Sequence, residues 1–407
     1  MTAGTAAFST ASSATSSRVP GRILVRGVNW LGDAVMTTPA LQRLREHFAG
    51  FQITLVVHAK LADLWRHHPS VDEVITFPAG VGAWSVAASI RARQSASGRF
   101  DLALVLPNSP RSALEVWLAR IPRRIGYSRP WRSWWLTQVV PSRPGHVTMR
   151  KRSVQEIKRL TDPASHPRPA LAVPLPAAAH QTLDYLHLAA ALGAESSPVA
   201  PHIAVTSEET TAAVAKFGLA GSAPVFGLMP GAEYGPAKRW PADRFVAAAR
   251  EIQQRTTCTW LILGGKPEAK AAGDLARAIG TAASYVRPLA GQTSLRELCA
   301  VLKLCRVLLT NDSGPMHLAA AVGTPVIVPF GSTSAELTGP GLPGDPRHRL
   351  LRGRVPCAPC FRRTCPIDFR CMTNISVASV VEAVLDTVNS PSACHDPQSP
   401  PYSLPCS

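Results

Sequence analysis

The sequence has 407 residues, of which 46% are hydrophobic and 17% charged, which predicts two globular domains and excludes a disordered chain. The formal net charge of +17 is concentrated in the amino-terminal half, where residues 18–175 carry 23 Lys and Arg against 9 Asp and Glu. A basic half indicates a polyanionic partner, and composition alone leaves nucleic acid, anionic lipid and an acidic glycan open.

The chain opens on a polar stretch. Residues 1–17 lack both the basic start and the apolar core of a secretory signal, so we expect a disordered extension there. No apolar run approaches the roughly 18 to 20 residues that a membrane-spanning helix needs.

A strand over residues 21–27 and a helix over 34–48 come next. Asp33 lies at the start of this helix, where the helix dipole favours an acid as a cap or in the first turn. The same position would let a carboxylate accept a proton from a ligand. The residue pattern by itself leaves both roles open.

Further buried strands are predicted over 51–57, 71–77 and 101–106, with helices over 59–68 and 111–120. Strands that alternate with helices at this spacing predict a parallel, doubly wound sheet. The last strand closes on turn residues that either form a plain turn or face a ligand. They are Asn108, Ser109 and Arg111.

Residues 122–159 are rich in arginine and tryptophan, and a short basic helix is predicted over 149–160. Such a stretch suits an anionic membrane surface or single-stranded nucleic acid, and buried tryptophans under a basic rim explain it equally well. A helix over 181–192 follows, and we place the hinge between the two domains within 201–222.

Three loops in the carboxyl-terminal half follow predicted strands and precede helices or turns. The first, 230–241, contains Lys238; the second contains Asn311, Asp312, Ser313 and Gly314; the third ends in Gly331-Ser332-Thr333. Loops at the carboxyl edge of a parallel sheet, with helix amino termini behind them, are typical of phosphate binding. The alternatives are a surface lysine and an ordinary helix cap.

Other elements of this half are a strand over 260–263 and helices over 268–279 and 377–388, before a Pro/Ser-rich tail at 389–407 that we expect to be disordered. Gly264-Gly265 lacks the spacing of a dinucleotide fingerprint. Glu268 either contacts a ribose or is a first-turn acid.

Four cysteines lie within residues 357–371. Their thiols would bind zinc or pair as disulfides, and a third role is that of reduced, packed side chains. In a chain without an export signal we favour reduced thiols, with a structural zinc ion as the alternative, and we expect no obligatory cofactor. The four residues are Cys357, Cys360, Cys365 and Cys371.

Several of these segments resemble bacterial lipopolysaccharide heptosyltransferases, most closely the heptosyltransferase II type. They are PGAEYGPAKRWP (230–241), TNDSGPMHLAAA (310–321), PFGST (329–333), VNWLGDAVMTTPAL (28–41), LPNSPRSAL (106–114) and PCAPCFRRTCP (356–366). The resemblance covers most of residues 21–385. It implies an α/β, GT-B-like fold in which two Rossmann-like, doubly wound domains face a central cleft. The acceptor-binding domain would then span 18–200 and the donor-binding domain 223–388.

The resemblance also implies a reaction: inverting transfer of heptose from ADP-heptose to the first heptose of the lipopolysaccharide inner core. The enzyme would act in the cytoplasm, on the anionic inner face of the inner membrane, without nucleic acid. Asp33 would be the general base, and Lys238 would stabilise the leaving ADP. Donor-binding candidates are Gly231, Glu233, Lys238, Glu268, Asp312, Ser313, Gly314 and His317. Acceptor-binding candidates are Asn29, Trp30, Asn108, Ser109 and Arg111.

The sequence also allows three other hypotheses about function. A related glycosyltransferase would share the donor half and use another sugar or acceptor. A nucleic-acid-binding protein would explain the charge. A zinc-stabilised scaffold without activity would explain the cysteines. The sequence leaves the oligomeric state, the acceptor and the linkage undetermined.

Overall fold

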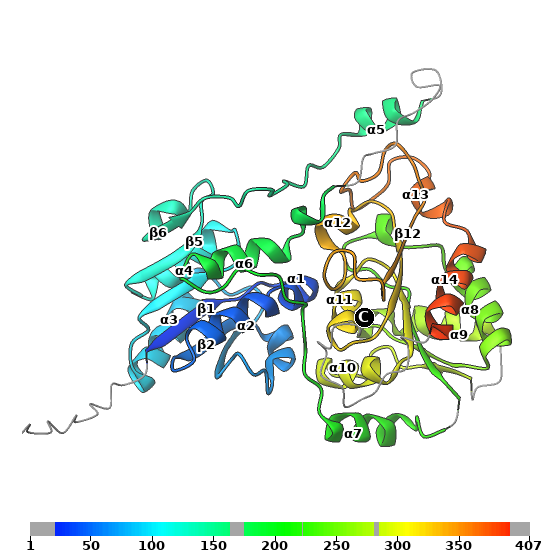
Figure 1. The fold of residues 1–407 in the computed structure, drawn as a ribbon, viewed down its shortest axis with the longest axis horizontal. Coiled ribbons are helices and arrows are strands. Elements are labelled where there is room, and N and C mark those ends of the chain that lie inside the picture. Colours follow the sequence, from blue (N-terminus) through cyan, green and yellow to red (C-terminus); the bar gives the residue numbers. More distant parts are fainter. Residues whose placement is uncertain (1–20, 163–174, 222, 281–284, 391–407) are drawn as a thin grey trace, which may run out of the picture.

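The computed structural model describes residues 21–162, 175–221, 223–280 and 285–390. They form two parallel six-stranded sheets that lie side by side, each with helices on its faces (Figure 1). Within these ranges, no helix combines the length and the apolarity that crossing a bilayer requires.

The first sheet has the strand order β3-β2-β1-β4-β5-β6, and every neighbouring pair is parallel. Its central strand β1 is buried along its whole length, as expected for a strand covered on both faces. The strands are β1 (Arg22–Arg26), β2 (Gln52–His58), β3 (Glu73–Phe77), β4 (Leu102–Val105), β5 (Arg123–Tyr127) and β6 (Gln138–Val140).

The second sheet repeats this topology, with the order β9-β8-β7-β10-β11-β12 and parallel pairing throughout. In both sheets the strand order reverses beside the first strand, which is where doubly wound folds bind ligands. The strands are β7 (Val225–Met229), β8 (Thr259–Ile262), β9 (Val286–Pro288), β10 (Val307–Thr310), β11 (Val326–Phe330) and β12 (Arg349–Arg352).

Helices connect the strands of both sheets. Those between residues 31 and 190 are α1 (Leu31–Met36), α2 (Thr38–His47), α3 (Ala83–Ser97), α4 (Pro110–Leu118), α5 (Val154–Thr161) and α6 (Thr182–Ala190). Those after residue 200 are α7 (Ser207–Phe217), α8 (Ala242–Thr256), α9 (Ala269–Ile279), α10 (Leu295–Leu304), α11 (Gly314–Ala321), α12 (Ala335–Thr338), α13 (Arg370–Thr373) and α14 (Val377–Asn389). Short 3₁₀ helices span Ala59–Trp65, Ser133–Trp135, Ala177–Ala179, Pro236–Lys238 and Lys266–Glu268.

The two domains share one apolar core. Ile23 and Val25 of β1 point toward a cluster that also contains Leu188 of α6 and, from the second domain, Leu318 of α11. Leu24, between them, points to the opposite face of its sheet and packs in a separate cluster. Alternate residues of one strand therefore face different layers, and the central layer joins the domains.

The helix expected over 34–48 is two helices, and the prediction of one continuous helix was wrong. α1 ends at Met36, and the hydroxyls of Thr37 and Thr38 donate to the Ala34 and Val35 carbonyls at 2.7 and 2.8 Å. Pro39 lies in the first turn of α2, where its ring and missing N–H are tolerated. In one long helix Pro39 would clash with the carbonyl four residues earlier.

Helix α5 packs on the second domain although strand β6 before it and helix α6 after it belong to the first. Ile157 is buried in the outer core of the second domain. The Arg152 amide donates to the Cys360 carbonyl at 3.0 Å, and Arg362 donates to the Arg152 carbonyl at 3.0 Å. The first domain, expected as a continuous unit over 18–200, is therefore interrupted by a segment that docks on its partner (Figure 1).

The predicted hinge at 201–222 contains α7, which packs against α10. Arg296 of α10 holds it by pairing with Glu209 and by donating to the Ala204 carbonyl at 2.9 Å. A capping box of Thr206 and Glu209 begins the helix. Much of this segment is thus an ordered part of the second domain.

Candidate active site

Asp33 lies in the first turn of α1, directly beyond the carboxyl end of β1. The N-cap position of this helix is Trp30, which makes no side-chain cap bond, so Asp33 is not the cap. Its Oδ1 accepts a hydrogen bond from the amide of Gln181 at 3.4 Å. Burial raises the pKa of Asp33 to about 6, against the opposing effects of Lys238 and of this hydrogen bond. The group is therefore ionised at neutral pH and more basic than an ordinary carboxylate.

Gln181 connects Asp33 to both domains. Its side-chain amide donates to the Tyr185 hydroxyl at 2.8 Å, and its backbone amide donates to the Leu337 carbonyl of the second domain at 2.9 Å. Sequence reasoning missed this residue because nothing in the pattern distinguishes it from a surface glutamine at a helix start.

Two glycines allow the domains to meet beside Asp33. A Cβ on Gly32 would stand 2.7 Å from Cδ2 of His317, and one on Gly314 would stand 2.9 Å from Cβ of Leu31. Both distances are shorter than real contacts, so only glycine fits at these positions. The amino-terminal turns of α1 and α11 consequently lie against each other.

Lys238 forms an ion pair with Asp312, with Nζ 2.6 Å from Oδ2. Both side chains are largely buried, with 12% and 4% exposed. The Thr333 hydroxyl donates to the same carboxylate oxygen, and the ammonium group lies 4.8 Å from the ring centroid of Tyr234. The three predicted loops therefore converge on one buried charge pair.

Asn311 fixes the distance between two of these loops. Its Oδ1 accepts from the Trp240 amide at 2.9 Å, and its Nδ2 donates to the Pro230 carbonyl at 2.6 Å. Sequence reasoning treated Asn311 as a turn residue. Its fully buried position, directly after a strand, is the signal that separates it from a surface turn.

The start of α11 presents polar groups without partners. Ser313 occupies the N-cap position but makes no cap bond, and its buried hydroxyl has no partner in the described part of the chain. His317, one turn later, is neutral at physiological pH because burial lowers its pKa to about 3, although Asp312 opposes the shift. The Met316 amide already donates to the Ser313 carbonyl at 3.1 Å and Pro315 has no N–H, so the start of α11 offers an anionic ligand its helix dipole and the unpartnered Ser313 hydroxyl.

The remaining donor candidates divide into two groups. Glu268 lies over the glycine loop: a Cβ on Gly231 would overlap its Oε1, and its Oε2 accepts from the Gly265 amide at 2.8 Å. Glu233 points elsewhere, toward Lys60 of the first domain at 3.7 Å, and is 72% exposed. The structure thus brings Glu268 and Gly231 together and leaves Glu233 on the rim.

Of the acceptor candidates, Trp30 is 46% exposed and has Lys60 5.1 Å from its ring centroid. Ser109 caps α4 by accepting from the Ser112 amide at 3.2 Å, which gives it a structural role. Asn108 accepts from the buried Arg132 at 3.3 Å.

Asn29 and Arg111 are connected through an ion-pair network, buried at Arg26 and Glu115, that the sequence did not reveal. Glu115, fully buried, pairs with Arg26 at 2.7 Å and with Arg111 at 2.9 Å. Arg26 also donates to Oδ1 of Asn29 at 3.4 Å. A charged residue in an otherwise apolar pattern, Arg26 at the end of β1 and Glu115 within α4, is the signal that could have found the pair.

The four clustered cysteines line one small cavity of about 10 Å³, together with Ala237 and Ser332 of the first and third loops. Burial raises the pKa of Cys371 to about 12 and shifts those of Cys357 and Cys360 upward. Across the described ranges, no group of three or more His, Cys, Asp or Glu side chains is arranged to hold a metal ion. The structural zinc stays a prediction.

Comparison with known proteins agrees with this geometry. Residues 90–369 match glycosyltransferase family 9 (heptosyltransferase). The chain is 29% identical to lipopolysaccharide heptosyltransferase 2 of Salmonella typhimurium over 323 residues, which cover 78% of this chain and 85% of the relative. It is 29% identical to lipooligosaccharide heptosyltransferase 2 of Haemophilus influenzae over 335 residues, which cover 82% and 90%.

Among solved structures, ADP-heptose lipopolysaccharide heptosyltransferase II of Escherichia coli superimposes with a TM-score of 0.69 at 25% identity. The match covers 90% of this chain and 98% of that one. The expected GT-B-like arrangement of two Rossmann-like domains is confirmed by this match and by the two parallel sheets.

Proposed function

The chain belongs to glycosyltransferase family 9, and from this premise we propose that it transfers heptose from ADP-heptose to the first heptose of the lipopolysaccharide inner core. Relatives named lipopolysaccharide and lipooligosaccharide heptosyltransferase 2, which it matches over most of their length, support a glycan acceptor of this kind, and the structure named ADP-heptose lipopolysaccharide heptosyltransferase II supports the donor. A related glycosyltransferase with another donor or acceptor is the alternative that the experiment below separates.

The observation that carries the proposal is that Asp33 and Lys238 lie within electrostatic range of each other across the domain interface. Each follows the first strand of its sheet, and the two are close enough for the ammonium group to lower the pKa of the carboxyl. A base and a cation on facing sheet edges are the two groups that a transfer between an acceptor and a diphosphate donor needs.

The reaction follows from these positions. Asp33 removes the proton of the acceptor hydroxyl while that oxygen attacks the anomeric carbon of the heptose from the face opposite the diphosphate. A bond forms between the anomeric carbon and the acceptor oxygen. The bond between the anomeric carbon and the β-phosphate oxygen breaks, its electron pair stays on that oxygen, and ADP leaves. Lys238 and the positive end of the α11 helix dipole stabilise the charge that develops on ADP.

Asp312 has a positioning role in this scheme. Its carboxylate holds Lys238 at 2.6 Å, so the ammonium group is oriented before the donor arrives. Preorganised charge stabilises a transition state without the cost of reorienting the side chain during the reaction. We assign Glu268, which lies against Gly231, to the nucleoside part of the donor.

Two measurements test the proposal together. Calorimetric titration with ADP and ADP-heptose, beside GDP and UDP, should give selective adenine-nucleotide binding. Mass spectrometry of a core acceptor that carries one heptose should then show the addition of a second. Preference for UDP or GDP would contradict the donor assignment, and adenine binding without transfer would contradict the acceptor.

We further propose that the enzyme works in the cytoplasm on the anionic face of the inner membrane. Trp131 and Trp134, in a stretch rich in arginine, are 72% and 78% exposed and lie edge to face at 6.0 Å. Exposed indoles beside cations suit the interfacial region of a bilayer. In sedimentation with anionic vesicles, Trp131→Ala/Trp134→Ala should reduce binding, whereas Trp117→Ala on α4 should not. Equal binding to zwitterionic vesicles would argue against the anionic surface.

A further inference from the structure

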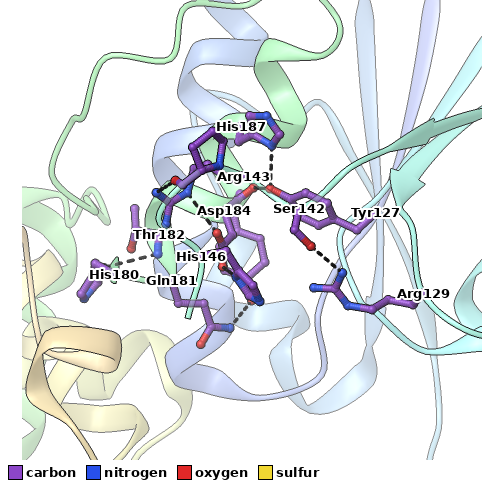
Figure 2. Close-up of polar contacts among 12 residues, drawn as sticks. Tyr127, Arg129, Ser142, Arg143, His146, His180, Gln181, Thr182, Asp184 and His187 are labelled. Atoms are coloured by element: carbon purple, nitrogen blue, oxygen red, sulfur yellow. Dashed lines mark hydrogen bonds and ion pairs between the residues drawn. The ribbon is translucent and has the colours of Figure 1, made fainter. Parts of the chain in front are cut away.

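A cluster of polar side chains on the acceptor side of Asp33 has no role in the reaction as described so far. Figure 2 shows Arg143 and His146 converging on Asp184 of α6, with His187 and Gln181 on opposite sides of that carboxylate. Arg143 Nε lies 3.1 Å from Oδ1 and His146 Nδ1 lies 3.0 Å from Oδ2. One carboxylate therefore orients two basic groups.

The cluster lies at the ligand-binding edge of the first sheet. β1, β4, β5 and β6 run parallel, so the segments that follow β5 and β6 emerge at the same edge as Asp33. α6 completes the connection, because Asp184 follows Gln181 by one helical turn and Gln181 donates to Asp33.

The basic groups outnumber the acid that orients them. The Arg143 side chain is only 12% exposed, and its buried Nη2 has no hydrogen-bond partner among the described residues. A guanidinium N–H that is buried without a partner is costly unless a ligand supplies the acceptor.

Arg129 adds a second guanidinium to the cluster. Its Nη1 donates to the Ser128 carbonyl at 2.8 Å and to the Ser142 hydroxyl at 3.1 Å, and within the described ranges no carboxylate pairs with it. It also lines an open hollow of about 550 Å³ formed by residues 128–134, which leaves room for a ligand beside it.

Tyr127 forms hydrogen bonds with His187 and with the backbone of Asp184. The Tyr127 hydroxyl donates to the Asp184 carbonyl at 2.7 Å, so the His187 ring must donate to the hydroxyl oxygen through Nδ1, at 2.9 Å. Burial and the nearby Arg143 lower the pKa of His187, which is consistent with this neutral form. The ring therefore adds no positive charge, and the excess charge belongs to the two arginines.

We propose that Arg129, Arg143 and His146 bind an oxyanion of the acceptor saccharide, a phosphate or a carboxylate, and thereby set which acceptor hydroxyl faces Asp33. This inference rests on the proposed function and assigns the acceptor half of its site. Asp184 is a positioning residue that holds Arg143 and His146 ready for the oxyanion.

The test is steady-state kinetics of the full-length protein with saturating ADP-heptose and a core acceptor that carries one heptose. Arg129→Gln and Arg143→Gln should each raise the KM for the acceptor by about 10-fold to 100-fold, the range for a hydrogen bond to a charged group, with little change in kcat. Arg99→Gln, which removes the same charge from the opposite edge of the sheet, is the matched control and should leave the KM unchanged.

Two modified acceptors identify the oxyanion: one treated with phosphatase and one with its carboxyl groups converted to amides. The modification that removes the bound group should raise the KM of the wild-type enzyme and abolish the further effect of each arginine variant. The inference is overturned when both variants keep the wild-type KM, or when neither modification changes it.

Two more outcomes are separated by the same design. If melting shows that Arg143→Gln does not fold, Arg129→Gln decides the question, because its guanidinium bonds a carbonyl and a hydroxyl and otherwise contacts the Tyr127 ring, 5.5 Å away. Failure of the wild-type enzyme to transfer heptose would contradict the proposed function itself, whereas normal transfer with unaffected variants contradicts the oxyanion site alone.

Discussion

Gly32 lies directly against His317, so that a Cβ at residue 32 would stand 2.7 Å from Cδ2 of the imidazole. We expect Gly32→Ala to displace α1 from α11 and to move Asp33 relative to the donor site. A shift of about 1 Å in a reacting group can lower turnover by up to about 100-fold. Kinetics should show this loss while calorimetry shows ADP affinity close to that of the wild type.

Gly273→Ala is the control for this substitution. Gly273 lies in the interior of α9, and only the distal Nη1 of Arg277 comes within 4.0 Å of a Cβ built there. The alanine should stabilise the helix by roughly 0.5–1 kcal/mol without a change in activity. Wild-type turnover in Gly32→Ala would show that the contact between α1 and α11 does not set the position of Asp33.

Asp33→Asn should lower turnover by about 10²-fold to 10⁴-fold, as expected for loss of a general base, with ADP binding retained. The raised pKa of Asp33, about 6, means that folding favours its protonated form. Ionised Asp33 therefore destabilises the fold above pH 6, and the effect disappears as the pH falls below 4. Thermal melting should show Asp33→Asn to be more stable than the wild type at pH 8 and not at pH 3.5. Loss of ADP binding would point to a structural role.

The pH dependence of the reaction should report the same group. Because the base must be ionised, kcat/KM should rise with pH and level off above about 6. Gln181 donates to the carboxylate and so lowers its pKa; Gln181→Leu removes that donor and should move the inflection to higher pH. An unchanged inflection in this variant would mean that a different group titrates.

How far the sequence predicts this site depends on whether a residue's role shows in its local pattern. Asp33, Lys238, Asp312 and Ser313 lie in the loops and helix starts that follow strands, and parallel topology brings the ends of neighbouring strands to one edge. Their convergence was therefore predictable. The strand order of the first sheet was not, because β5 lies in the arginine- and tryptophan-rich stretch, where charged residues hide the strand pattern.

The missed residues act through tertiary contacts. Gln181 matters because it precedes α6 and lies beside Asp33 in the folded chain. Glu115 matters because it pairs with Arg26 of β1. Neither contact can be predicted from the periodicity of the sequence. The docking of α5 is hidden for the same reason, since one buried Ile157 in a basic helix resembles an ordinary amphipathic pattern.

Removal of Lys238 should separate its electrostatic role from its structural one. Lys238→Met leaves Asp312, only 4% exposed, without its cation, and removal of one partner of a buried pair costs about 3–5 kcal/mol. The double variant Lys238→Met/Asp312→Asn should recover much of this stability in denaturant unfolding. ADP affinity should be about 10-fold to 100-fold weaker in both. Recovery of ADP affinity in the double variant would contradict a phosphate contact by Lys238.

The cysteine cluster should behave as reduced thiols. In a protein with Cys394→Ser and Cys406→Ser, which lie outside the described residues, a thiol reagent should react first with Cys365, the half-buried member of the cluster. The buried members, with raised pKa values, should react only on unfolding. Stoichiometric zinc released on unfolding would instead establish the metal site.

The passage of α5 across the domain boundary limits how the enzyme can move. The chain leaves the first sheet after β6, anchors through Arg152 and Ile157 beside the cysteines, returns to α6, and crosses again to α7. The hydrogen bond from the Arg296 amide to Oδ2 of Asp63, at 2.9 Å, and the packing of α1 on α11 add further attachments between the domains. Any relative movement of the domains during substrate entry and product release would therefore have to carry or detach the α5 segment beside the cysteine cluster.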